Sequence, residues 1–195
     1  MLGVCHVKLG DFNAARACFL RALELDPRSL DATLGIAVLD MNSGDPRARS
    51  RALEALVQAF AVEPAHPGLL SVLAGEALGM EDFERAGALA DAAASMFEQA
   101  AAGGSREAQS FLAEATCVGG RARHAMGDFT NAALLYQKAS SLPGLPRRPL
   151  LALLGMSQMF LRQSHVRDAA TNAVGALEQV LAQVRVPATR TMPMV

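Results

Sequence analysis

Apolar residues recur along this chain at intervals of three and four positions, with polar residues between them. One such run, Leu70, Leu73, Ala74 and Ala77, would share a single helix face, as expected of an amphipathic α-helix. Alanine and leucine, both strong helix formers, dominate the sequence, and β-branched runs typical of strands are scarce. The pattern therefore predicts an all-α protein.

A short motif marks the predicted turns between helices. Its copies are Gly10-Asp11-Phe12 leading to Ala15, Glu81-Asp82-Phe83 leading to Ala86, and Gly127-Asp128-Phe129 leading to Ala132. Recurrence of this kind indicates a repeat architecture. The motif resembles the turn between helix A and helix B of the tetratricopeptide repeat, a helix-turn-helix unit of about 34 residues.

Prolines and glycines suggest where the first repeats end. In the first repeat, Phe19 stands at a helix B position that packs between helix pairs, and Pro27 closes the repeat. The second repeat is predicted to have helix A at 29–41 and helix B at 51–62. The turn at 42–46 between these helices is rich in loop-forming residues and about three residues longer than usual.

The later repeats depart further from the regular period. The third begins at Pro67, and about twelve extra residues, including Gly103-Gly104, precede the next helix A at 106–126, so its helix B is expected to be extended. A fifth repeat, with helices near 148–163 and 168–184, is degenerate because Ser164 replaces the turn glycine. We therefore expect about five repeats over residues 1–184.

Both ends of the sequence depart from a regular array. Residues 185–195 contain two prolines without apolar periodicity and are expected to be disordered. The first repeat lacks the start of its helix A, because Gly3 already occupies the position where the paired helices pack. The chain is therefore expected to be part of a longer array, or a truncated gene model, with the first repeat incomplete.

The predicted repeats indicate a protein-binding surface. A single repeat cannot bury its apolar stripe, so the helices are expected to stack into a right-handed superhelix whose inner wall is lined by the A helices. Helical spacing assigns the following partner-binding positions to that wall: Asp31, Val38, Asn42, Arg121, His124, Gln158 and Arg162. The competing interpretation is that each is a solvated or packing side chain. A basic cluster at Arg47, Arg49 and Arg51 could pair with an acidic partner segment or simply begin a helix.

Composition argues against several other functions. The formal net charge is −1, so direct nucleic-acid binding is not expected. No apolar run approaches the ~20 residues that span a membrane, and no secretory signal is visible, so a soluble intracellular protein is expected. The three cysteines and four histidines lack metal-ligand or disulfide-framework spacing, and the cysteines are expected to be buried packing residues. Catalytic and phosphate-binding motifs are also missing, so we expect neither an enzyme nor a protein that binds a cofactor, a metal or a small molecule.

The departures from a regular repeat are similar to those of one family. They comprise Leu34–Ser43 with the inserted Gly44–Pro46, the spacer before the fourth repeat, Ala113–Cys117 leading to Arg123–Phe129, and Gly155–Phe160. In this combination the chain resembles, over about residues 1–182, the tetratricopeptide scaffold subunit of the Paf complex, which associates with elongating RNA polymerase II. The resemblance implies a nuclear scaffold for transcription elongation and linked chromatin modification. Its implied partners are other Paf complex subunits and, through them, RNA polymerase II.

The alternatives are a tetratricopeptide co-chaperone and another assembly adaptor built from the same repeat. Co-chaperones of this class clamp a carboxylate-ended tail with lysines, an arginine and asparagines at set inner positions. Val4, Gly35, Gly68 and Val72 occupy those positions here. A tail carboxylate would then lose its charge-assisted hydrogen bonds. The adaptor alternative stays open at this point.

Overall fold

The computed structural model describes residues 2–143, 145, 149–162 and 167–184. These residues form helices and connecting turns and contain no β-strand, which confirms the all-α class. They divide into two compact units, Met1–Glu76 and Ala77–Val195. The predicted turn at Ser164 and the predicted tail at 185–195 lie outside the described residues.

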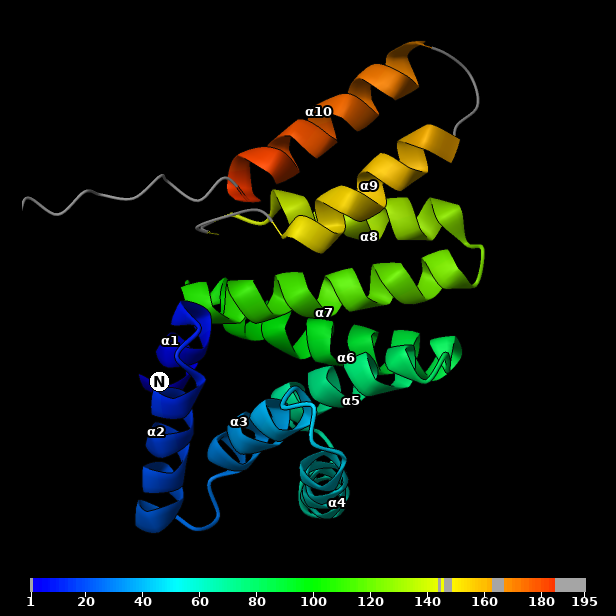
Figure 1. Ribbon diagram of the computed structural model, residues 1–195. Coiled ribbons are helices and arrows are strands. Elements are labelled where there is room, and N and C mark those ends of the chain that lie inside the picture. Colours follow the sequence, from blue (N-terminus) through cyan, green and yellow to red (C-terminus); the bar gives the residue numbers. More distant parts are fainter. Residues whose placement is uncertain (1, 144, 146–148, 163–166, 185–195) are drawn as a thin grey trace, which may run out of the picture. The chain divides into compact units, whose positions relative to one another are not determined.

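The first unit contains four helices and most of a fifth. They are α1 (Leu2–Leu9), α2 (Phe12–Leu25), α3 (Leu30–Met41), α4 (Pro46–Val62) and α5 (Pro67–Gly79), whose last residues belong to the second unit. Successive helices α1 to α4 pack against one another, and short turns join them (Figure 1). This is the arrangement that the alternation of A and B helices predicts.

The core of the first unit is organised around Phe19 on α2, which is 7% exposed. Its ring occupies space left by glycines on both neighbouring helices. A Cβ atom added to Gly3 of α1 would lie 2.7 Å from Phe19 Cζ, and one added to Gly35 of α3 would lie 2.6 Å from Cε1. The prediction that Phe19 fills the interface between helix pairs is confirmed.

Helix α4 begins earlier than the sequence predicted. Helix B of the second repeat was expected to start at Arg51, after a long loop, but α4 starts at Pro46. Asp45 is its N-cap and accepts a hydrogen bond from the Arg47 backbone N–H at 2.9 Å. Proline is favoured at the first helical position because its missing N–H would have no partner there. The extra residues therefore lengthen the helix instead of the turn.

The second unit contains α6 (Phe83–Ala102), α7 (Arg106–Ala125), α8 (Phe129–Ser141), α9 (Leu150–Arg162) and α10 (Arg167–Val184). Helices α6 and α7 each have 20 residues and pack along their length (Figure 1). Phe97 and Phe111 stack near the turn that joins the two helices, with ring centroids 5.5 Å apart. The predicted extension of helix B in the third repeat is confirmed.

Tyr136 on α8 has the role in the second unit that Phe19 has in the first. It is 1% exposed, and its ring lies against glycines of the two adjacent helices. A Cβ atom on Gly120 of α7 would lie 2.9 Å from Tyr136 Cε1, and one on Gly155 of α9 would lie 2.7 Å from Cδ2. An aromatic ring between two glycines therefore sets the spacing of neighbouring helices in both units.

The Asp-Phe motif works as a helix start at each of its copies. The carboxylates of Asp11, Asp82 and Asp128 accept hydrogen bonds from the backbone N–H three residues later, at 3.0, 3.3 and 3.3 Å. This satisfies one of the free donors at the start of each B helix. The residue before each aspartate has a positive φ, which is 62° at Glu81 and suits glycine better.

The motif alanines are confirmed as packing residues, and the prediction for the cysteines is only partly correct. Ala15, Ala86 and Ala132 are each 0% exposed. Cys117 is buried, but Cys18 is half-buried and Cys5 is exposed on α1. Sequence spacing alone did not show that Cys5 lies on the outward side of its helix.

Candidate interaction surface

The predicted wall positions in the first unit lie on one face of α3. Asp31 is largely exposed, and its Oδ1 is 3.5 Å from Nε2 of His66, the residue before α5. Val38 is half-buried, and Asn42 is exposed. This face therefore offers a carboxylate at one end and an amide at the other, separated by an apolar side chain.

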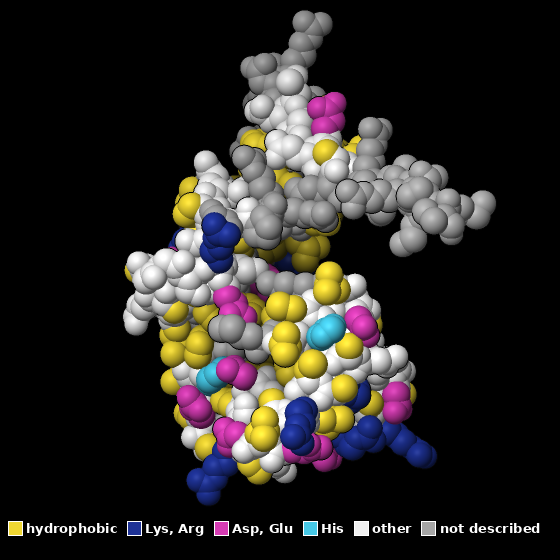
Figure 2. Space-filling model, turned by 90° about the vertical axis from the view of Figure 1, so that its left-hand side faces the viewer, with side chains coloured by type: hydrophobic (Ala, Val, Ile, Leu, Met, Phe, Trp, Pro, Cys, Tyr) yellow, Lys and Arg dark blue, Asp and Glu magenta, His cyan; other side chains and the backbone are white. Residues whose placement is uncertain are grey.

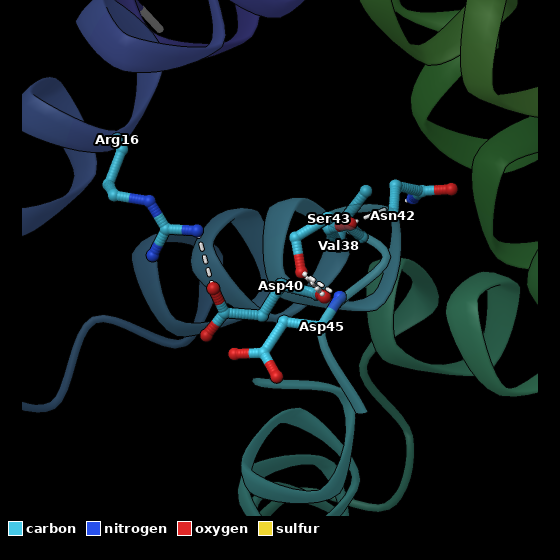
Figure 3. A network of polar contacts seen from close by, with 6 residues as sticks. All are labelled: Arg16, Val38, Asp40, Asn42, Ser43 and Asp45. Carbon is cyan, nitrogen blue, oxygen red and sulfur yellow. Dashed lines mark hydrogen bonds and ion pairs between the residues drawn. The ribbon is translucent and has the colours of Figure 1, made fainter. Parts of the chain in front are cut away.

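Asn42 is held at the end of α3 by a small hydrogen-bond network (Figure 3). Its side-chain amide donates to the Val38 carbonyl at 2.8 Å. The Ser43 hydroxyl donates to the Asp40 carbonyl at 2.7 Å and accepts from the Asp45 backbone N–H at 3.2 Å. These bonds satisfy carbonyls that the helix leaves free at its end, so the turn after α3 is well defined.

The predicted positions on α7 lie beside the Tyr136 ring. Arg121 is exposed and His124 is half-buried. The His124 ring packs edge-on against Phe129 and Tyr136, with centroid distances of 5.7 and 6.3 Å. Its Nδ1 is 3.4 Å from the Tyr136 hydroxyl. His124 therefore contacts the core residue Tyr136, while the Arg121 side chain is exposed.

Burial raises the pKa values of two side chains near Arg121. The pKa of the Cys117 thiol rises to about 11 because burial disfavours the thiolate, while the Arg121 charge opposes this rise and Glu114 adds to it. The pKa of Tyr136 rises to about 12, chiefly through burial. Both side chains are therefore neutral at physiological pH, and the fixed positive charge on this part of α7 belongs to Arg121.

The remaining predicted positions are on α9. Gln158 is exposed on this helix, which packs against α7 and α8. Arg162 is the last residue of α9, and its side chain lies outside the described part. The seven positions thus form two groups, one on α3 in the first unit and one on α7 and α9 in the second.

The basic cluster on α4 splits into paired and unpaired members. Arg49 forms an ion pair with Glu76 of α5, with Nη2 and Oε2 2.5 Å apart. Arg47 and Arg51 are exposed, and no ion pair with either occurs among the described residues. The interpretation of this segment as a helix start is correct, because all three follow Pro46 on α4.

An ion pair that the sequence did not predict joins α6 and α7. Arg123 pairs with Asp91 and also donates to the Gly119 carbonyl at 3.3 Å. A Cβ atom on Gly119 would lie 3.4 Å from the guanidinium, and one on Gly87 would lie 3.8 Å from it. Two buried glycines inside long helices were the only sequence signal for this contact. Glycine lowers helix stability, so its presence there suggests that a neighbouring side chain occupies the space that a Cβ atom would fill.

The described residues show how the surface is composed. Lysine, arginine and carboxylate side chains are interspersed with apolar ones on the face seen in Figure 2, so neither charge dominates it. Within the described ranges no group of three or more His, Cys, Asp and Glu side chains is placed to hold a metal ion. None of the described helices combines the length and apolar character that crossing a bilayer requires.

Comparison with known proteins gives sequence relatives for this arrangement. The tetratricopeptide repeat model matches residues 1–29. The RNA polymerase-associated protein CTR9 of Caenorhabditis elegans is 28% identical over 168 residues, which are 86% of this chain and 14% of that protein. The Protein CTR9 homolog of Arabidopsis thaliana is 25% identical over 178 residues, 91% of this chain and 16% of that protein. The chain thus spans about a seventh of the length of these relatives.

Solved structures support the fold. A tetratricopeptide-repeat protein of Thermus thermophilus is 22% identical, with a TM-score of 0.57, and the match covers 91% of this chain and 88% of that one. At this identity the likeness concerns the fold alone. Together with the capped helix pairs and the ring-between-glycines packing, it shows an all-helical fold of the tetratricopeptide-repeat type. In sequence, the chain is similar to part of the CTR9 proteins.

Proposed function

We propose that the chain is a protein-protein interaction scaffold from the tetratricopeptide subunit of the Paf complex. The single observation that carries this is the similarity to CTR9 proteins over 86% of the chain, since one of them is named as RNA polymerase-associated. The proposed partners are other Paf complex subunits and, through them, RNA polymerase II. The proposed site of action is the nucleus, in transcription elongation and linked chromatin modification.

In this proposal residues 1–184 form an array of about five repeats, and the A helices supply the contacts. The exposed charged and amide side chains among its proposed contact positions are Asp31, Asn42, Arg121 and Gln158. The proposed role is non-catalytic and requires no cofactor, metal, small molecule, membrane or direct nucleic-acid contact. The mixed charge of the face in Figure 2 supports this, because nucleic acid is bound by predominantly basic surfaces.

The co-chaperone alternative is not favoured. Its clamp would need a polar side chain at Gly35, but the Phe19 ring fills the space that any side chain there would occupy. The position cannot supply a cationic or amide donor without displacing the core of the first unit.

Charge reversal on α7 tests the proposed surface. Arg121→Glu in the tagged full-length protein should reduce co-purified Paf complex subunits modestly, by roughly two- to fivefold, because one exposed charge contributes little alone. Arg85→Glu on α6 is the matched control, since Arg85 is also exposed but lies on a B helix. Equal recovery with both variants would remove Arg121 from the interface.

A buried substitution tests whether the segment matters at all. Ala86→Asp places a carboxylate at a position that is 0% exposed, which should unfold the repeat and release the partner. Circular dichroism would report the unfolding. A folded Ala86→Asp protein that still co-purified its usual subunits would show that this segment is not part of the assembly surface.

A further inference from the structure

A groove in the first unit lies between α2 and α4, with α3 as its floor. Its volume is about 210 Å³, and its lining residues are Leu23, Thr33, Ile36, Ala37, Asp40, Arg51, Ala52 and Ala55. The sides are low because α4 contributes only small apolar side chains next to Arg51. This leaves an open, mainly apolar hollow large enough for one leucine- or phenylalanine-sized side chain.

The groove is separate from the proposed wall of A helices. Successive residues of an α-helix are turned by about 100°, which places Thr33, Ile36 and Asp40 on the side of α3 opposite to Asp31 and Asn42. A partner bound along the wall would leave the groove free. The groove is therefore a candidate binding site separate from the wall.

Charge at one end of the groove is unbalanced. The carboxylate there, Asp40 of α3, is already engaged by Arg16 of α2, as Figure 3 shows. Arg51 also lines this end and is exposed, and the part of the chain that the structure describes contains no ion pair for it. The end of the groove therefore favours an incoming anion.

We propose that this groove binds a segment of a partner protein in which a bulky apolar side chain stands next to an aspartate or glutamate. The apolar side chain would cover Leu23 and Ile36, and the carboxylate would accept hydrogen bonds from the Arg51 guanidinium. Arginine suits this task because its planar fork matches a carboxylate. The occupant is thus an acidic, apolar peptide held on the outer face of the first unit.

Selection from a phage-displayed library of random linear peptides tests the proposal with the full chain as bait. The expected sequences combine Asp or Glu with a neighbouring Leu, Ile or Phe. A synthetic peptide of the selected sequence should bind at least about tenfold more weakly to the Arg51→Glu chain, equivalent to ~1.4 kcal/mol. Arg51→Lys should retain part of the affinity, because lysine keeps the charge but not the fork.

Two further variants separate the groove from general charge effects. Ala55→Trp fills the hollow from its half-buried position and should weaken binding as Arg51→Glu does, with circular dichroism confirming that the chain stays folded. Arg47→Glu, which carries the same charge change outside the groove, should leave affinity unchanged within about twofold. The proposal would be overturned if the selected peptides bound the Arg51→Glu chain as tightly as the wild type, or if the selection gave no peptide whose affinity depends on Arg51. So would Arg51-dependent binding of a single-stranded oligonucleotide in place of the peptide.

Discussion

Tyr136→Ala tests the packing principle on which both units depend. The ring is 1% exposed and lies between the glycines of α7 and α9. Removing it takes away the transfer free energy of a buried aromatic side chain and leaves a cavity, because two rigid helices cannot fully close the gap. We expect the free energy of unfolding to fall by roughly 3–5 kcal/mol, a large part of the ~5–15 kcal/mol of a typical domain.

Tyr136→Phe separates the ring from its hydroxyl. The hydroxyl lies 3.4 Å from His124 Nδ1, which is long for a hydrogen bond. Losing this contact should cost about 1 kcal/mol or less. A loss as large as that of Tyr136→Ala would mean that the polar contact, and not the ring, holds the helices together.

The reverse perturbation adds an atom where the ring already lies. A Cβ atom at Gly155 would be 2.7 Å from Tyr136 Cδ2, whereas one at Gly175 of α10 would meet nothing within 4 Å beyond its chain neighbours and the backbone of its own helix. Gly175→Ala should therefore stabilise by up to ~1 kcal/mol through helix propensity. Gly155→Ala should destabilise by ~1–3 kcal/mol through overpacking.

Urea denaturation followed by circular dichroism measures these differences, and amide hydrogen exchange locates them on α7, α8 and α9. A Tyr136→Ala variant that stays within about 1 kcal/mol of the wild type, which is the size of an ordinary surface change, would contradict this role of the ring. Shifts of Gly155→Ala and Gly175→Ala in the same direction would also contradict it.

Three other changes test separate parts of the structure. Glu81→Gly should raise the unfolding free energy by ~0.5–1 kcal/mol, because glycine adopts the positive φ of 62° without strain. Glu84→Gly, in the first turn of α6, should lower the unfolding free energy by a similar amount. Equal effects of the two variants in thermal melts would contradict this explanation. Between pH 9 and 11 the unfolding free energy should fall, by up to about 2–3 kcal/mol, because the Cys117 thiol ionises near 9.0 when unfolded and near 11 when folded. Cys117→Ala should flatten that part of a pH-dependent urea titration, and an unchanged slope would refute it. Phe19→Ala should destabilise by up to ~3–5 kcal/mol, and an unchanged urea midpoint would show that Phe19 does not hold α1 and α3.

Local signals in the sequence were sufficient for most helix boundaries. The Asp-Phe motif located the starts of α2, α6 and α8, because aspartate is a strong N-cap and the following residues are helix formers. The same reasoning failed at α4, where loop-forming residues hid a proline at the first helical position. Position relative to a cap, more than composition, decides whether such a segment is loop or helix.

Pairings across the sequence could not be derived in the same way. Arg16 with Asp40 and Arg123 with Asp91 are separated by 24 and 32 residues, so they depend on how neighbouring helices face one another. The groove beside Arg51 could not be predicted from the sequence for the same reason, since three helices contribute to it. The sequence predicted which helix faces are polar, while only the packed structure shows which charges remain unpaired.

Affinity purification of the tagged full-length protein from nuclear extract, followed by mass spectrometry, tests the central claim most directly. The proteins recovered with wild type and with Ala86→Asp would be compared at equal amounts of tagged protein, so that proteins bound nonspecifically to both can be subtracted. We expect recovery of Paf complex subunits and RNA polymerase II with the wild type and their loss with Ala86→Asp. Specific recovery of chaperones, without any polymerase-associated subunit, would contradict it.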